Sequence, residues 1–201
     1  NAVKIANEMN IPLLYISTAG IFNGKKSLYS EKDIPDPICH YAKSKYKGEL
    51  YVQNNAKSYL ICRAGWMMGG GAKKDKKFIN KIIKQINNGS KILYIVNDKL
   101  GTPTYTHDFA NNVKLLIQNN ISGLFNMVCQ GVTSRIEVAK EIIRLIGKES
   151  EIDIVEVESD FFKDEYFAER PRCERLENYK LNQINLDKMR HWKIALKEYL
   201  K

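Results

Sequence analysis

The 201-residue sequence predicts an α/β fold, on the strength of three observations. Short continuous apolar runs, such as residues 13–16 and 59–63, are typical of strands in a parallel sheet. Segments with apolar residues at helical spacing lie between these runs. Strands and helices therefore alternate along the chain, and this order is typical of a parallel sheet with helices on both faces.

The first half of the chain is expected to contain two helices and two strands. Helical spacing over residues 1–9 indicates a helix already under way at the first residue, as in part of a longer protein. The apolar run 13–16 predicts a strand buried on both faces. A polar loop follows, and then a helix over residues 38–55 with Pro37 near its start. Residues 59–63 form the second expected strand.

Capping signals mark two helices of the second half. Thr106, or the pair at 107–108, is placed to cap one helix. Thr133 or Ser134, followed by Glu137, has the pattern of a capping box. The elements expected here are helices over residues 76–88, 106–119, 134–146 and 192–200, and strands over residues 91–96, 123–128 and 152–157.

Charge and hydropathy limit the partners of the protein. Lys and Arg outnumber Asp and Glu by 32 to 23, giving a net charge of +9. The excess is mostly dispersed Lys, so a solvated surface is favoured over a nucleic-acid face, and no nucleic-acid partner is expected. No apolar run reaches the roughly 20 residues of a membrane span, so no membrane partner is expected either. One dense cluster could attract an anionic small substrate: Lys73, Lys74, Lys76 and Lys77.

The cysteines and histidines point to no disulfide framework and no metal site. Cys39, Cys62, Cys129 and Cys173 form no Cys-x-x-Cys pair, which favours a reduced, cytoplasmic protein. The three histidines lie far apart in sequence, and the spacing does not suit zinc.

Tyr41 and Lys45 are the strongest candidates for chemistry. They lie four residues apart in an expected helix, so their side chains share one face. An ammonium group stabilises a nearby phenolate, so such a pair can exchange a proton near neutral pH. This exchange protonates an oxygen as hydride reaches a carbonyl carbon. Taken alone, the pair could also be a chance feature of a surface helix.

The preceding strand adds context, because it ends at Ser17 and Thr18. Side chains at the carboxyl end of a parallel strand face the crevice where ligands bind. A hydroxyl group there can donate a hydrogen bond to the oxygen that Tyr41 protonates. The order strand, Ser-Thr, loop and Tyr-x-x-x-Lys is the one seen in short-chain dehydrogenases.

Five segments then resemble one family. Residues 15–24 are similar to its "YISTDYVFDG", and residues 37–49 to its "P-x-x-x-Y-G-x-S-K-x-x-G-E". Residues 62–66 are similar to its "R-x-S-W", residues 101–110 to its "G-x-P-T…D-x-A", and residues 170–176 to its "RP…L". The segments also follow the family's order. The chain therefore resembles the dTDP-4-dehydrorhamnose reductases of the extended short-chain dehydrogenase/reductase superfamily.

This resemblance implies a partial Rossmann-like parallel sheet with a small α/β substrate lobe. Residues 1–69 would be the C-terminal part of the NAD(P)-binding domain. Residues 70–201 would form the substrate lobe, with elements near 106–146 returning to the sheet. The family's glycine-rich phosphate loop is not found in this sequence. The resemblance therefore implies that this part is inactive alone and works within a longer protein.

The resemblance also implies an oxidoreductase that reduces a 4-keto nucleotide sugar with NADPH or NADH, as in dTDP-rhamnose biosynthesis. By position, Tyr41 would donate a proton to the C4 oxygen, and Thr18 would hold that oxygen. Lys45 would assist Tyr41 and bind the nicotinamide ribose. Ser17 and Ala64 would lie on the cofactor side.

Three further residues are expected on the substrate side: Trp66, Phe78 and Arg170. Trp66 matches a residue that lines the sugar pocket in the family, although a core or interface position is its alternative. Phe78 and Arg170 are weaker candidates, because an apolar helix residue and a lone Arg have ready structural explanations. A homodimer, and Mg²⁺ at an interface between subunits, are further expectations from the resemblance alone.

The chain departs from the family beside the expected reaction centre. Ala19 stands where the family has Asp, and Gly20 where it has Tyr. Lys77 stands where Asn is common. These changes leave the identity of the sugar substrate undecided. They also leave two alternative functions: a nucleotide-sugar epimerase or dehydratase, and a non-catalytic regulatory subunit like the relatives that regulate methionine adenosyltransferase.

Overall fold

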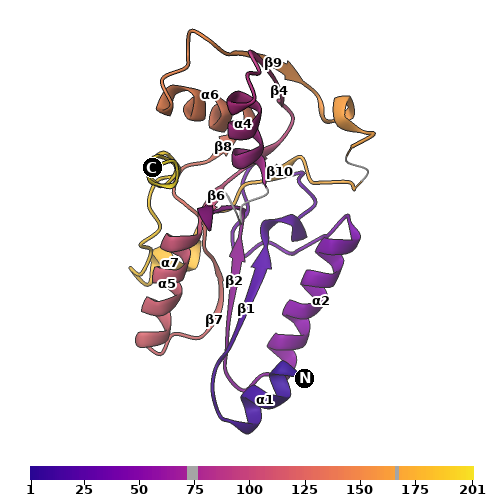
Figure 1. Cartoon of the computed structure of the whole chain (residues 1–201). Coiled ribbons are helices and arrows are strands. Elements are labelled where there is room, and N and C mark those ends of the chain that lie inside the picture. The colour runs from indigo at the N-terminus through magenta and orange to yellow at the C-terminus, as the bar shows by residue number, and fades with distance from the viewer. Residues whose placement is uncertain (72–76, 166–167) are drawn as a thin grey trace.

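A parallel sheet of three strands lies in one half of the molecule (Figure 1). The computed structural model describes residues 1–71, 77–165 and 168–201. The strands β1 (Leu13–Thr18), β2 (Tyr59–Ala64) and β7 (Gly123–Asn126) are ordered β1-β2-β7, and both pairings are parallel. The predicted α/β class with parallel strands is therefore confirmed.

Helices cover the two faces of this sheet. Helix α2 (His40–Asn55) lies on one side and α5 (Thr106–Gln118) on the other (Figure 1). Because side chains alternate along a strand, the buried residues of β2 divide between two cores. Ile61 packs with Val52 of α2, while Leu60 and Cys62 belong to the cluster that contains α5.

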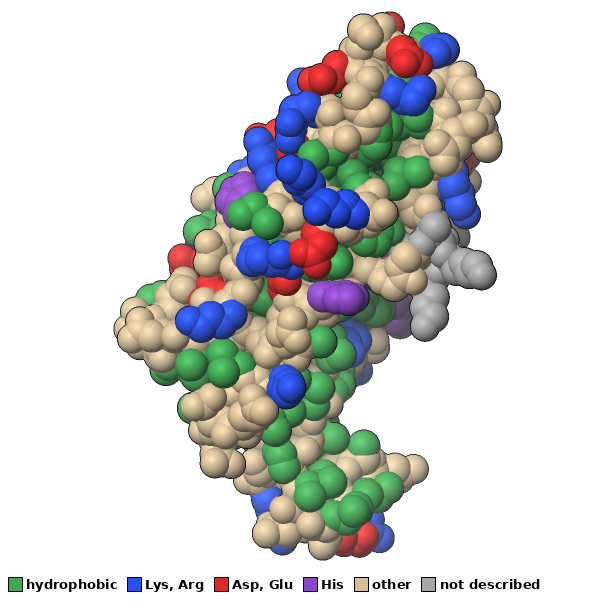
Figure 2. All heavy atoms as spheres, turned by 60° about the vertical axis from the view of Figure 1, so that its left-hand side comes forward, with side chains coloured by type: hydrophobic (Ala, Val, Ile, Leu, Met, Phe, Trp, Pro, Cys, Tyr) green, Lys and Arg blue, Asp and Glu red, His purple; other side chains and the backbone are tan. Residues whose placement is uncertain are grey.

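Within these 201 residues β1 is the edge strand of the sheet, and this part of the protein does not bury it on both faces as predicted. Leu14 is 40% exposed and Ile16 is 44% exposed. The core cluster that contains α5 reaches β2 but includes no residue of β1 among the described residues. The apolar run therefore predicted the strand correctly, but it did not predict which residues pack against the two faces of that strand. Apolar side chains gather at the lower end of Figure 2, and the exposed ones from α1 to β1 are Ile5, Met9, Ile11, Leu14 and Ile16.

The other half of the molecule is built from short strands and helices. Here α4 (Phe78–Asn87) and α6 (Arg135–Leu145) accompany a parallel pair, β4 (Ile92–Val96) and β9 (Asp153–Val157). Short strands join the two halves: β3 (Trp66–Met68) pairs with β6 (Pro103–Tyr105), and β5 (Leu100–Gly101) lies between β8 (Thr133–Ser134) and β10 (Cys173–Glu174). The remaining elements are α1 (Ala2–Glu8), η1 (Ala19–Ile21), η2 (Ser159–Phe162), α7 (Tyr179–Gln183) and α8 (Trp192–Tyr199).

The capping predictions had different outcomes. Ser134 caps α6, and its Oγ accepts a hydrogen bond of 3.1 Å from the Glu137 amide, so that prediction is confirmed. Helix α5 is capped by neither Thr106 nor residues 107–108. Its N-cap is Tyr105, which makes no side-chain cap, because β6 runs directly into the helix.

The surface mixes charges of both signs. On the face in Figure 2, Lys and Arg side chains lie among acidic and apolar ones. Of the dense lysine cluster, Lys73, Lys74 and Lys76 lie outside the described residues. No described helix has the length and hydropathy needed to cross a bilayer. All four cysteines are free, and burial raises the pKa of Cys62 and Cys129 to about 12.

Candidate active site

Helix α2 is fixed to the sheet by two contacts that involve Gly48 and Glu49. The Glu49 carboxylate accepts two hydrogen bonds from Arg63 of β2, at 3.0 and 2.7 Å. This ion pair is buried, with side-chain exposures of 0% and 4%. One residue earlier, a Cβ on Gly48 would lie 2.1 Å from Tyr15 Oη, so glycine is needed for the ring to pack there. These contacts set the position of the helix that carries Tyr41 and Lys45.

Lys45 lies at the carboxyl end of β1. Its Nζ donates a 2.6 Å hydrogen bond to the Ile16 carbonyl and lies 4.2 Å from the centre of the Tyr15 ring. Tyr15 Oη in turn donates to the Lys45 carbonyl at 3.0 Å. Tyr41 stands one helical turn before Lys45, and its side chain is 52% exposed. The phenol is therefore open to a ligand while its lysine neighbour is held in place.

The hydroxyl groups at the end of β1 differ in their surroundings. Thr18 Oγ1 accepts a 3.2 Å hydrogen bond from the Gly20 amide, which leaves its O–H free to donate to another group. Ser17 points to the opposite face, is 4% exposed, and has no hydrogen-bond partner for Oγ within the described part of the chain. Ala64 of β2 lies beside Thr18 in the parallel register.

Arg170 comes to the same place from the C-terminal part of the chain. Its guanidinium carbon lies 5.9 Å from the centre of the Tyr41 ring. The Arg170 carbonyl accepts a 3.1 Å hydrogen bond from Lys99 Nζ, which ties this segment to the residue before β5. The structure thus brings Arg170 beside Tyr41, although 129 residues separate them in sequence.

Trp66 and Phe78 meet in a group of four residues that we call the Trp66 cluster: Trp66, Phe78, Arg135 and Glu174. The Arg135 guanidinium lies 3.7 Å from the centre of the Trp66 ring and 4.4 Å from that of Phe78. The Trp66 indole N–H donates a 3.0 Å hydrogen bond to Glu174 Oε2. A cation and a carboxylate therefore both contact Trp66, the residue that was predicted to line the sugar pocket.

Sequence reasoning missed Arg135 and Glu174. Burial lowers the pKa of Arg135 to about 10, and the nearby Glu174 carboxylate acts in the opposite direction. One signal was available for Arg135, because it is the first residue of α6, where the helix dipole disfavours a positive charge. Glu174 had no such signal, since it joins Trp66 only through the pairing of β10 with β5.

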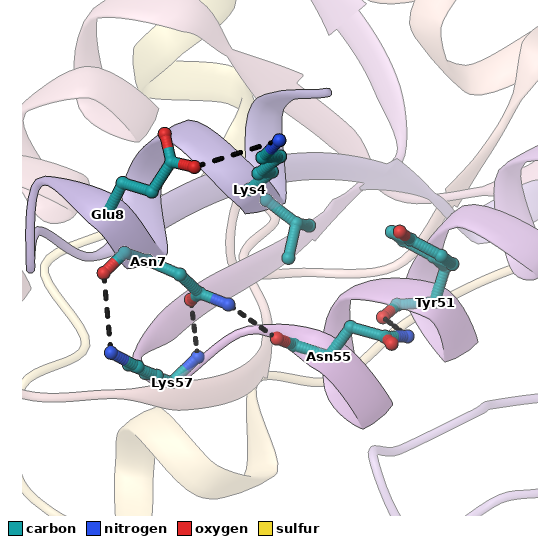
Figure 3. A pocket seen from close by; sticks show the side chains of 7 residues that line it. Lys4, Asn7, Glu8, Tyr51, Asn55 and Lys57 are labelled. Carbon is teal, nitrogen blue, oxygen red and sulfur yellow. Dashed lines mark hydrogen bonds and ion pairs between the residues drawn. The ribbon is translucent and has the colours of Figure 1, made fainter.

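A separate cavity of about 340 Å³ lies between α1, the end of α2 and the start of β2 (Figure 3). Asn7 crosses its edge: its side chain donates to the Asn55 carbonyl and accepts from the Lys57 amide, both at 2.8 Å. This cavity lies at the amino end of β2. Ligands of parallel sheets bind at the carboxyl ends, so the site around Tyr41 and Thr18 is the stronger candidate.

One known protein family matches the chain along its whole length. The profile of the RmlD substrate binding domain matches residues 1–201, the whole chain. The chain belongs to this family. The predicted resemblance to dTDP-4-dehydrorhamnose reductases is therefore confirmed.

Individual relatives give the extent of the similarity. The spore coat polysaccharide biosynthesis protein SpsK of Bacillus subtilis is 32% identical over 93% of this chain and 63% of its own length. A dTDP-4-dehydrorhamnose reductase from Yersinia enterocolitica has a solved structure that is 35% identical, with a TM-score of 0.90 over 98% of this chain and 69% of that chain. The reductase from Bacillus anthracis, solved in complex with NADP, is 26% identical, with a TM-score of 0.90 and coverage of 98% and 68%. The chain thus spans less than two thirds of SpsK.

Proposed function

We propose that this RmlD-family chain is part of a longer NAD(P)H-dependent oxidoreductase that reduces the keto group of a 4-keto nucleotide sugar. The arrangement at the end of β1 carries the proposal. There an accessible Tyr41 and an anchored Lys45 lie one turn apart on α2, and Lys45 binds the Ile16 carbonyl, two residues before Thr18 with its free O–H. The dTDP-4-dehydrorhamnose reductases among its structural neighbours support the substrate class.

The roles of the three side chains follow from their chemistry. Tyr41 Oη donates its proton to the keto oxygen as the carbonyl carbon is reduced to an alcohol. Thr18 Oγ1 donates a hydrogen bond to the same oxygen and orients it. Lys45 places a positive charge one turn from the phenol, which favours the phenolate that remains after the transfer. Trp66 and Phe78 line the sugar side, and Arg170 lies at the entrance beside Tyr41.

The residues present also suit a nicotinamide cofactor. When bound, NADPH or NADH supplies the hydride. An ammonium group carries three N–H donors, and Lys45 uses one of them on the Ile16 carbonyl. Another donor can therefore bind a ribose hydroxyl, and the buried Ser17 Oγ and the backbone at Ala64 lie on the same edge of the sheet. The glycine-rich loop that binds the pyrophosphate belongs, in this proposal, to the part of the protein beyond these 201 residues.

The proposal extends to organisation and location. Residues 1–69 complete the cofactor domain and residues 70–201 form the substrate lobe. Of the segment near 106–146 that was expected to return to the sheet, α5 and β7 do so, whereas α6 packs with β4 in the other half. Four cysteines without a disulfide favour a cytoplasmic enzyme. A homodimer is included on the resemblance alone.

Isotope transfer tests the reaction type. The full-length protein is mixed with dTDP-4-dehydrorhamnose and NADPH that carries deuterium at the transferable position, and the sugar product is analysed by mass spectrometry. A reductase gives stoichiometric oxidised cofactor and one deuterium at sugar C4. An epimerase or dehydratase regenerates its cofactor and consumes none in net terms, and a regulatory subunit leaves both compounds unchanged. Either of these results contradicts the proposal.

A further inference from the structure

We propose that Glu174 and Gly20 together determine which sugar the site accepts, by recognising a hydrogen-bond donor next to the keto carbon. This inference rests on the proposed function, because it places the keto oxygen at Thr18 and Tyr41. It concerns two positions outside the proton-transfer machinery. At one of them, Gly20, the chain departs from the family pattern.

The space beside Gly20 is the first observation. A Cβ on Gly20 would lie 3.1 Å from Glu174 Oε1 and 3.6 Å from Thr18 Oγ1. Among the described residues, no other non-neighbouring atom lies within 4 Å of that point. The tyrosine of the family pattern would begin in this gap. In this chain the gap stays open, and it is bordered by the hydroxyl that holds the keto oxygen and by a carboxylate oxygen.

The orientation of Glu174 is the second observation. Its Oε2 is held by the Trp66 indole N–H at 3.0 Å, and β10 is fixed by its pairing with β5. Arg135 lies over the indole ring, whereas Glu174 accepts from the N–H at its edge, and the two residues interact through their charges. Oε1, which faces Gly20, has no hydrogen bond or ion pair to any described residue. The carboxylate is thus anchored through one oxygen and presents the other, an acceptor, to the gap.

An ionised carboxylate accepts hydrogen bonds and donates none. With glycine at position 20 no side chain stands between this acceptor and the gap, so the gap favours a ligand group that donates a hydrogen bond. In a 4-keto-6-deoxy sugar, C5 carries a methyl group, and C3 is the neighbour of the keto carbon that carries a hydroxyl. Glu174 therefore selects sugars with a hydroxyl or an amino group at C3. A site built for such a donor rejects an analogue that lacks it, because its acceptor is left unpaired.

Binding without cofactor tests this selection separately from turnover. Calorimetric titration of the full-length protein with dTDP-4-dehydrorhamnose and with its 3-deoxy analogue gives two dissociation constants. We expect the 3-hydroxy sugar to bind about 10- to 100-fold more tightly, as for a hydrogen bond to a charged group. Glu174→Leu should remove that difference by weakening the 3-hydroxy sugar only, and Glu174→Gln should restore part of it. Glu177→Gln, an exposed neighbour, should change neither constant.

Gly20→Tyr provides a second route that keeps the Glu174 carboxylate but crowds its Oε1. It should fill the gap and reduce the ratio of the two constants, even if Glu174→Leu fails to fold. Equal binding of both sugars by the wild type, or an unchanged ratio in both variants, overturns the inference and leaves the proposed reduction standing. Selective binding that depends on Glu174, without any deuterium transfer to the sugar, supports the inference and rejects the proposed function instead. Failure of the wild type to bind either sugar rejects the inference.

Discussion

The proton-transfer region and the Trp66 cluster are built in different ways. Tyr41 and Lys45 are positioned by consecutive elements, β1, α2 and β2, whose contacts involve Gly48, Glu49 and Arg63. Most of these residues fall in segments that match the family pattern. The Trp66 cluster instead joins four separate segments, and two of its members, Arg135 and Glu174, were not found from sequence. The first region is thus assembled from elements that are consecutive in sequence, whereas the second depends on contacts between distant segments.

Breaking the ion pair between Glu49 and Arg63, beneath α2, is expected to have the largest effect on stability. Glu49→Gln leaves Arg63 buried without a charged partner and should lower the free energy of unfolding by about 3 kcal/mol. Glu8→Gln is the matched control, because its pair with Lys4 is exposed and contributes little. Urea unfolding of both variants measures the difference. Equal stability of the two would mean that the pair does not hold α2 to the sheet.

Gly48→Ala tests the packing of α2 on Tyr15. Alanine normally stabilises a helix relative to glycine, but here its methyl group would collide with Tyr15 Oη. We therefore expect a loss of about 1–3 kcal/mol in unfolding free energy and a lower turnover number, since Lys45 would shift with the ring. Lys47→Ala, at an exposed neighbouring position, is the control. A more stable and fully active Gly48→Ala variant would show that this contact is dispensable.

Gly101→Ala perturbs the Trp66 cluster. Its Cβ would lie 2.2 Å from Trp66 Cε2, so the half-buried indole must move away from Glu174. The expected cost is about 1 kcal/mol, or roughly a fivefold weaker affinity for the nucleotide sugar, with turnover at saturating sugar preserved. Steady-state kinetics separates the two quantities. A fall in turnover with unchanged affinity would contradict the assignment of Trp66 to substrate binding.

Two features could be predicted from the sequence because their signals are local. They are the alternation of strands and helices and the pair of Tyr41 and Lys45. The sequence could not reveal that the rest of these 201 residues leaves Leu14 and Ile16 of β1 partly exposed, since an apolar run does not say what covers it. The short strands β3, β5, β6 and β10 are too brief for any periodicity. They nevertheless bring Glu174 to Trp66, and for this reason half of the Trp66 cluster was missed.

The role of Tyr41 as proton donor is open to a direct kinetic comparison of two variants. Tyr41→Phe and Tyr51→Phe each remove an exposed phenol from the same helix. Turnover of the full-length variants is measured with saturating NADPH and dTDP-4-dehydrorhamnose. We expect Tyr41→Phe to be slower by about 10²- to 10⁴-fold, as for loss of a general acid, and Tyr51→Phe to match the wild type. Equal turnover of the two variants would contradict the account.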